Sequence, residues 1–132
     1  RPYDLMPFLE KKALNCCRGK VLDVGAGAGS HALYLQENEF DITALDISPM
    51  AVDIMKRRGL LNAVCADIYK YEGKTYDTLL LLMNGIGLCG NLHGLDQFLA
   101  HARKLLKPGG QVILDSTDIL YLYEDEEEEE SK

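Results

Sequence analysis

The sequence has no excess of basic residues. Its 132 residues include 14 lysines and arginines against 21 aspartates and glutamates, which gives a formal net charge of −7. Seven of the acids form the unbroken run 124–130, so residues 1–123 hold 14 acids and 13 bases and are close to neutral. Proteins that bind phosphate backbones without sequence preference depend on a basic surface. The composition therefore disfavours a bare nucleic-acid-binding module.

Long apolar segments and paired cysteine motifs are also missing. The longest apolar run, residues 79–83, is far shorter than the roughly 20 residues that cross a bilayer. No secretory signal is present, and Cys16, Cys17, Cys65 and Cys89 show no Cys-x-x-Cys spacing. These absences favour a cytoplasmic protein with buried, reduced thiols over a disulfide-bonded or zinc-binding one, and we expect no metal site and no membrane contact.

The chain divides into three parts by composition. Residues 1–19 hold a predicted helix, residues 20–118 form one folded domain, and residues 119–132 form an acidic tail. We expect this tail to be solvated and disordered because neighbouring like charges repel one another. The first residues are Arg1-Pro2 rather than methionine, so we expect the sequence to be a piece of a longer protein.

Apolar residues recur alternately at strand and helix spacing along most of the chain. Bases 56–58 are interpreted as a solvated helix end beside the negative pole of the helix dipole. Short strands that are apolar on both faces are typical of a parallel sheet covered by helices, so the pattern predicts a three-layer, doubly wound α/β fold. Ligands of such folds bind beyond the carboxyl ends of the strands. Strands are predicted at 20–25, 41–46, 62–65, 77–83 and 111–115, and helices at 5–14, 30–37, 48–58 and 95–106.

The first predicted strand ends in a glycine-rich turn. Asp23 precedes the closely spaced Gly25, Gly27 and Gly29. Glycine permits positive φ angles and close approach of a ligand to the backbone, and the following helix offers unpaired N–H groups. A strand-to-helix turn that needs glycine only for its sterics is the alternative. A dinucleotide fingerprint G-x-G-x-x-G would require its third glycine at position 30, where this sequence has Ser30.

Polar residues also end the next three strands. Asp46 ends the second, 21 residues beyond the first glycine of the turn, where a carboxylate can accept both hydroxyls of a ribose. Asp67, after the third, can accept a hydrogen bond from the exocyclic amine of a purine whose faces contact Ile47 and Ile68. The alternative is that Asp67 only caps a turn. Asn84 begins a segment of small residues after the fourth strand.

Together these motifs resemble those of class I S-adenosylmethionine-dependent methyltransferases, over about residues 20–118. The matching segments, in order and spacing, are 21–29, Asp46, 66–68 and the Leu-Lys-Pro-Gly-Gly segment 106–110. The resemblance implies a Rossmann-like sheet of strand order 3-2-1-4-5, with S-adenosylmethionine as cofactor and S-adenosylhomocysteine as product. It implies in-line displacement of the sulfonium methyl by an N, O, S or C nucleophile.

The resemblance also implies a role for each motif. The glycine turn and the acid before it would hold the methionine part of the cofactor, and the acid ending the second strand would hold the ribose. The acid after the third strand would bind the adenine amino group between two isoleucines, and the asparagine would lie beside the sulfonium. The cofactor-binding residues so implied are Asp23, Gly25, Ala26, Gly27, Gly29, Asp46, Ile47, Asp67, Ile68 and Asn84.

No catalytic residue is assigned, since alignment and desolvation can suffice for this chemistry. His93 is a candidate for a base or a contact with the acceptor, with a polar loop residue as the alternative. Tyr3, which precedes the first helix, is a second candidate for contact with the acceptor. Family members usually continue through a sixth strand and an antiparallel seventh, and we expect both to be missing here. Strand five would then be an exposed edge open to self-association.

The methyl acceptor is not identified by the sequence. A small molecule or a protein is favoured over nucleic acid. Two further hypotheses stay open: an NAD-binding oxidoreductase domain, which would share the glycine turn and Asp46, and a scaffold domain that binds S-adenosylmethionine without catalysis.

Overall fold

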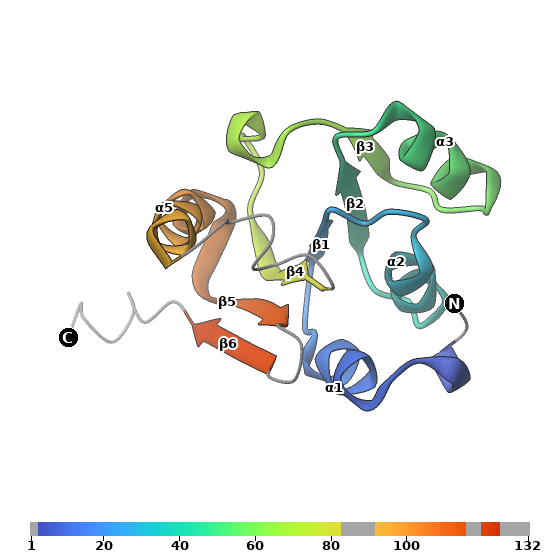
Figure 1. Ribbon diagram of the computed structural model, residues 1–132, viewed down its shortest axis with the longest axis horizontal. Helices are drawn as coiled ribbons and strands as arrows, with labels where there is room; N and C mark the ends of the chain where they lie inside the picture. Colours follow the sequence, from blue (N-terminus) through green and yellow to red (C-terminus); the bar gives the residue numbers. More distant parts are fainter. Residues whose placement is uncertain (1–2, 83–91, 116–119, 125–132) are drawn as a thin grey trace.

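The computed structural model describes residues 3–82, 92–115 and 120–124. In these residues six strands form one sheet of order β3-β2-β1-β4-β5-β6 (Figure 1). Strands β1 to β5 are parallel, and β6 is antiparallel to β5. The predicted order 3-2-1-4-5 of a mainly parallel sheet is therefore confirmed. The strands are β1 (Val21–Val24), β2 (Ile42–Asp46), β3 (Ala63–Cys65), β4 (Tyr76–Leu81), β5 (Leu106–Asp115) and β6 (Leu120–Glu124).

Helices cover both faces of the sheet, as a doubly wound fold requires (Figure 1). On one face, α1 (Phe8–Cys16), α2 (Ser30–Glu37) and α3 (Pro49–Arg57) bury apolar side chains against strand residues such as Val21. On the other face, α5 (Leu92–Ala102) and the short 3-10 helix η2 (Ile68–Lys70) pack against residues such as Leu22. Neighbouring strand residues reach opposite cores because successive side chains alternate across a strand. Two further 3-10 turns are η1 (Tyr3–Leu5) and η3 (Arg103–Leu105).

Local signals in the sequence set two helix starts correctly. Helix α2 has the predicted bounds 30–37, and α3 begins at Pro49 with Ser48 as its cap. The Ser48 hydroxyl accepts a hydrogen bond from the Ala51 N–H at 3.2 Å. This bond satisfies one of the unpaired N–H groups at a helix start. None of the helices within the described residues is long and apolar enough to cross a membrane.

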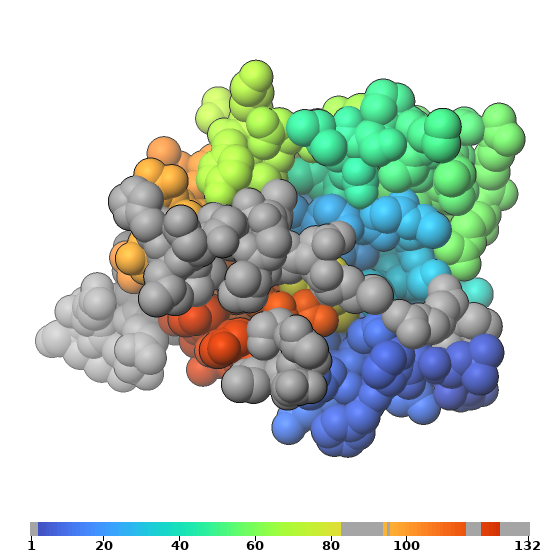
Figure 2. Space-filling model, in the orientation of Figure 1, coloured from blue at the N-terminus to red at the C-terminus, as the bar shows by residue number. Residues whose placement is uncertain are grey.

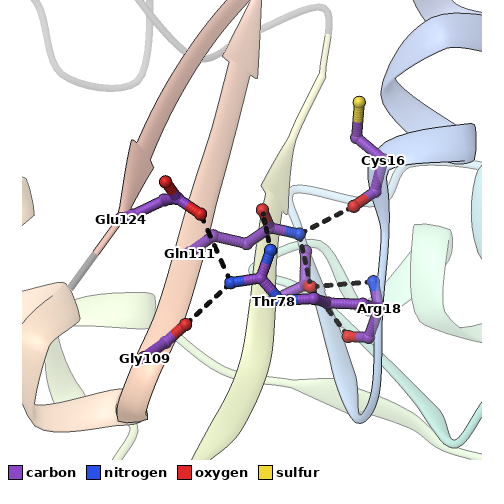
Figure 3. A network of polar contacts seen from close by, with 6 residues as sticks. All are labelled: Cys16, Arg18, Thr78, Gly109, Gln111 and Glu124. Carbon is purple, nitrogen blue, oxygen red and sulfur yellow. Dashed lines mark hydrogen bonds and ion pairs between the residues drawn. The ribbon is translucent and has the colours of Figure 1, made fainter. Parts of the chain in front are cut away.

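A polar network joins the end of α1 to the sheet (Figure 3). The buried Gln111 of β5 donates from Nε2 to the Cys16 carbonyl at 2.7 Å and to Thr78 Oγ1 at 3.1 Å. Its Oε1 accepts a hydrogen bond from Arg18 Nη1 at 2.9 Å. The Arg18 guanidinium also donates to the Gly109 carbonyl at 2.7 Å. Helix α1 is therefore fixed to β4 and β5 by bonds that satisfy buried polar groups.

The sixth strand corrects our expectation that the sheet stops after strand five. Residues 120–124 pair along the whole register from Asp115↔Leu120 to Gln111↔Glu124. We predicted that the tail begins at residue 119 because a run of acids follows. Leu-Tyr-Leu-Tyr at 120–123 nevertheless has the composition of a strand. Strand β5 is consequently not an exposed edge, and the basis for self-association through it is removed. Residues 125–132 lie outside the described residues, so disorder there stays a prediction.

Strand β5 begins earlier than predicted. It starts at Leu106 rather than at 111, and the predicted helix 95–106 ends as α5 at Ala102. The register with β4 is irregular, since Tyr76 pairs with Leu106 and Thr78 with Gln111. The extra residues of the Lys-Pro-Gly-Gly segment bulge out between these pairs, as insertions in a ladder do.

Candidate functional site

The turn that follows β1 is held by backbone bonds to the end of β2. The N–H groups of Gly25 and Ala26 donate to the Leu45 carbonyl at 2.8 and 3.0 Å, and the Gly29 N–H donates to the Ala26 carbonyl at 3.0 Å. Gly29 has φ +85°, and a Cβ there would lie 2.7 Å from Met55 Cγ in α3. Both its backbone angle and its close neighbour therefore require glycine at this position.

Asp46, at the end of β2, holds the same turn through its side chain. Its Oδ2 accepts a hydrogen bond from the Gly27 N–H at 2.8 Å, and its Oδ1 accepts one from the Ser48 N–H at 2.9 Å. Each carboxylate oxygen can accept a second hydrogen bond, so the group keeps capacity for a pair of hydroxyls. The carboxylate thus combines a structural bond to the turn with acceptor sites that no other described residue is shown to use.

A shallow pocket of about 110 Å³ opens beyond the ends of β1, β2 and β3. Asp46 and Asp67 contribute carboxylates to its lining, and Ile47 and Ile68 contribute apolar side chains. Ile68 is buried, whereas Ile47 is 70% exposed. The structure therefore brings together four residues that the sequence assigned to an adenosine. The full lining is Val24, Gly25, Leu45, Asp46, Ile47, Ala66, Asp67 and Ile68.

Asp67 has a structural role besides lining the pocket. Its Oδ1 accepts a hydrogen bond from the Tyr69 N–H at 3.0 Å and caps η2. The interpretation of Asp67 as a cap is therefore confirmed. Its position in the pocket leaves the interpretation as a ligand-binding residue open as well, since a carboxylate accepts more than one hydrogen bond.

Asp23, in β1, is a buried carboxyl with an unused oxygen. The residue is only 1% exposed, and Oδ2 has no hydrogen-bond partner among the described residues. Burial, with a smaller contribution from the charge of Asp46, raises the pKa of Asp23 to about 8. Burial, assisted by Asp23, likewise raises the pKa of the Cys17 thiol to about 12. An unsatisfied buried oxygen is costly, and a cationic or hydroxyl donor would relieve that cost.

A buried pair beside the turn was not found from the sequence. His31 Nε2, in the first turn of α2, lies 2.8 Å from Glu10 Oε1 in α1, and both residues are buried. The pair joins the helix that follows the glycine turn to the N-terminal helix. Single-sequence patterns gave no signal for it, because the contact spans two helices that meet only in the folded chain.

The remaining predicted residues are distributed as follows. Tyr3, a candidate for the acceptor side, stacks on Tyr34 of α2 with ring centroids 4.3 Å apart. His93 lies in the first turn of α5. Asn84 falls in 83–91, outside the described residues, and its place beside the sulfonium stays a prediction. Within the described residues, no three His, Cys, Asp or Glu side chains form a group that could hold a metal ion.

Comparison with known proteins relates this site to one family. A family model described as a methyltransferase domain matches residues 21–110. A solved S-adenosylmethionine-dependent methyltransferase from Bacteroides fragilis, in complex with S-adenosyl-L-homocysteine, is 43% identical with a TM-score of 0.81. That match covers 87% of this chain and 49% of the other.

Curated relatives are more distant. A 23S rRNA (uracil(747)-C(5))-methyltransferase from Pyrococcus horikoshii is 28% identical over 110 residues, which are 83% of this chain and 26% of that protein. A demethylmenaquinone methyltransferase from Tropheryma whipplei is 27% identical over 100 residues, 72% of this chain and 40% of the relative. The chain thus spans between a quarter and a half of the length of each of these three proteins.

Proposed function

This chain belongs to the methyltransferase domain family, and on that premise we propose that it transfers a methyl group from S-adenosylmethionine to an acceptor. S-adenosylmethionine is the cofactor of the family. The similar Bacteroides fragilis enzyme was solved in complex with S-adenosyl-L-homocysteine, the product that remains after the cofactor has lost its methyl group. When bound, the cofactor supplies a methyl group activated on a sulfonium, which an acceptor nucleophile can displace in line.

The observation that carries the proposal is the pocket with two carboxylates and two isoleucines beyond β2 and β3. In this proposal, the unused acceptor sites of Asp46 receive the ribose hydroxyls, and Asp67 accepts the adenine amino group. Ile47 and Ile68 cover the two faces of the ring. Acceptor-only side chains suit these three donors, because a diol and an exocyclic amine each present hydrogen atoms.

The methionine part of the cofactor fits the turn and the buried acid. Gly25, Ala26, Gly27 and Gly29 place bare backbone beside the N-terminus of α2, where unpaired N–H groups favour a carboxylate. Asp23 supplies a buried oxygen without a partner among the described residues. An ammonium group is a suitable donor to that oxygen, and the nearby charge of Asp46 also favours a cation.

The residues of this site bind and orient rather than exchange protons. None of the described side chains around the pocket is needed as a general base when the acceptor nucleophile carries no proton. Rigid placement of the reacting groups and exclusion of water lower the barrier of such a displacement. Hydrogen bonds from the turn to the Leu45 carbonyl and the Asp46 carboxylate already fix its backbone, which supports such rigid placement.

We infer that the acceptor is a small molecule or a protein rather than nucleic acid. Residues 1–123 carry 14 acids and 13 bases, so this part of the chain lacks the excess of positive charge that binds phosphate backbones. The relatives' names include both an rRNA and a quinone precursor, and the match to the rRNA enzyme covers only 26% of that protein. Most of that enzyme lies outside the matched segment, and residues that bind RNA can lie there.

Calorimetric titration with S-adenosylhomocysteine and, separately, NAD tests the cofactor. We expect micromolar or tighter binding of S-adenosylhomocysteine. Comparable binding of NAD with none of S-adenosylhomocysteine would establish the oxidoreductase alternative and overturn the proposal.

Methyl transfer is tested with S-adenosylmethionine labelled in the methyl group. The chain is incubated with total RNA, a protein extract or a small-molecule extract, and label is counted in each fraction. We expect label in the protein or the small-molecule fraction. Label confined to RNA would contradict the inferred acceptor class, and binding without label in any fraction would support a scaffold role.

A further inference from the structure

Arg58 lies directly after α3, and its side chain reaches the glycine turn. Its Nη1 donates to the Ala28 carbonyl at 2.7 Å and to Ser30 Oγ at 3.3 Å. The sequence predicted that bases 56–58 form a solvated helix end. Arg57 agrees with this, since it forms an exposed ion pair with Asp53 at 2.9 Å on its own helix. Arg58, although exposed, spans from α3 to the turn.

Helix α3 also packs against the turn through Met55. Met55 is fully buried, and its Cγ would lie 2.7 Å from a Cβ on Gly29. In the space-filling view, residues of α3 lie against the residues around the start of α2 (Figure 2). Two consecutive residues of the turn are therefore contacted from this segment, Ala28 by a hydrogen bond from Arg58 and Gly29 by the packing of Met55 in α3.

The bond from Arg58 acts on a peptide unit that is held from both sides. The Ala28 carbonyl and the Gly29 N–H belong to one planar peptide and point in opposite directions. Arg58 binds the carbonyl, and the Ala26 carbonyl accepts the N–H at 3.0 Å. Fixing one end of this plane therefore fixes the other, and with it the direction of the backbone that enters α2.

The bonds from β2 to the turn act on earlier peptide units. Leu45 holds the N–H groups of Gly25 and Ala26, and Asp46 holds that of Gly27. These anchors come from β2 and fix the first half of the turn. Arg58 is the side chain that binds the carbonyl of the second half, where the turn passes into the first turn of α2.

We propose that Arg58 is a positioning residue for cofactor binding, which holds the Ala28–Gly29 peptide in the orientation that receives the methionine part of S-adenosylmethionine. The inference rests on the proposed function. Arg58 does not line the pocket beyond β2 and β3, and it contributes through preorganisation, since a turn that is already ordered loses less conformational freedom on binding. Loss of the guanidinium leaves the turn folded but less restrained.

The test compares dissociation constants for S-adenosylhomocysteine of the full 132-residue chain and three variants. Arg58→Ala removes the bond, and Arg58→Lys keeps the charge and one donor nitrogen in place of the planar guanidinium. Arg57→Ala is the matched control because it removes the same charge one residue away. We expect Arg58→Ala to weaken binding roughly 3- to 10-fold, Arg58→Lys to recover part of the loss, and Arg57→Ala to change it less than about 2-fold.

A second ligand separates positioning from general destabilisation. Methylthioadenosine keeps the adenine, the ribose and the sulfur but lacks the amino-acid part, so it does not use the second half of the turn. Its affinity should be the same in Arg58→Ala as in the unmodified chain. Equal weakening for both ligands, equal weakening in Arg57→Ala, or unchanged S-adenosylhomocysteine affinity in Arg58→Ala would each overturn the positioning role. Failure of the unmodified chain to bind S-adenosylhomocysteine would instead overturn the proposed function, and this inference with it.

Discussion

The carboxylate of Asp46 holds the backbone of Gly27, whose N–H lies 2.8 Å from Oδ2. One acid at the end of β2 therefore connects the turn after β1 with the pocket beyond β3. A ligand bound at this carboxylate would therefore lie beside a turn whose backbone the same carboxylate holds in place. The glycine turn and the pocket are thus connected through one side chain.

Replacing Asp46 by alanine should weaken binding of S-adenosylhomocysteine by roughly 10- to 100-fold, or about 1.5–3 kcal/mol. The loss combines the hydrogen bonds to the ribose with the support of the turn at Gly27. Calorimetric titration measures it, with Asp53→Ala as the control, because Asp53 is an exposed acid on α3 away from the pocket. An unchanged affinity would show that Asp46 does not hold the ribose.

Asp67 should determine the preference for adenine. In Asp67→Ser, the hydroxyl can still cap η2 at the Tyr69 N–H, but it is too short to reach the base. We expect S-adenosylhomocysteine to bind about 3- to 10-fold more weakly, while the analogue with an unsubstituted purine, which lacks the exocyclic amine, binds as before. If the variant loses affinity for both ligands equally, Asp67 acts only as a cap.

Asp23 should make stability fall as pH rises. Its pKa of about 8 in the folded chain exceeds the ordinary value of 3.8, so between these values the folded state retains a proton that the unfolded state has lost. The free energy of unfolding therefore decreases with pH in this window, by up to about 1.4 kcal/mol per pH unit from this group. The isosteric Asp23→Asn variant lacks that dependence.

Urea unfolding of both proteins at pH 5 and pH 8 measures the effect. Relative to the unmodified chain, Asp23→Asn should gain stability on going from pH 5 to pH 8. A stability difference that is the same at both values would indicate that Asp23 has an ordinary pKa.

Gly29→Ala should cost more stability than an alanine at a glycine with an equally positive φ but open surroundings. Gly59 is the comparison, with φ +99° and no atom within 4 Å of its would-be Cβ. The backbone penalty of about 1–2 kcal/mol is shared by both sites, and the close contact with Met55 adds to it at Gly29. Chemical denaturation measures both, and equal losses would argue that Met55 shifts away freely.

Local signals in the sequence were sufficient for much of the fold. The capping hydroxyl of Ser48 before Pro49 located α3, and the glycine turn after a short apolar strand located α2. Strand ends in a parallel sheet meet at one edge, which is why Asp46 and Asp67 could be expected in one pocket from their positions at the ends of two predicted strands.

Features that depend on contacts between distant segments could not be predicted in this way. The Glu10–His31 pair and the reach of Arg58 to Ala28 join elements whose relative placement is set by packing, not by neighbouring residues. Strand β6 was missed for a different reason. Its strand-forming residues lie directly before a run of acids. We assigned them to the acidic tail because of that charge, although their own preference is for a strand.

The network around Gln111 has a consequence for the order of folding. Its amide bonds to the Cys16 carbonyl across 95 positions of the chain, and its Oε1 bonds to Arg18 across 93. Contacts between such distant positions require closure of a large loop, which is slow compared with forming a helix or a turn. We expect helix α1 to dock after β4 and β5 have paired, so that removing the Gln111 amide accelerates unfolding more than it slows folding.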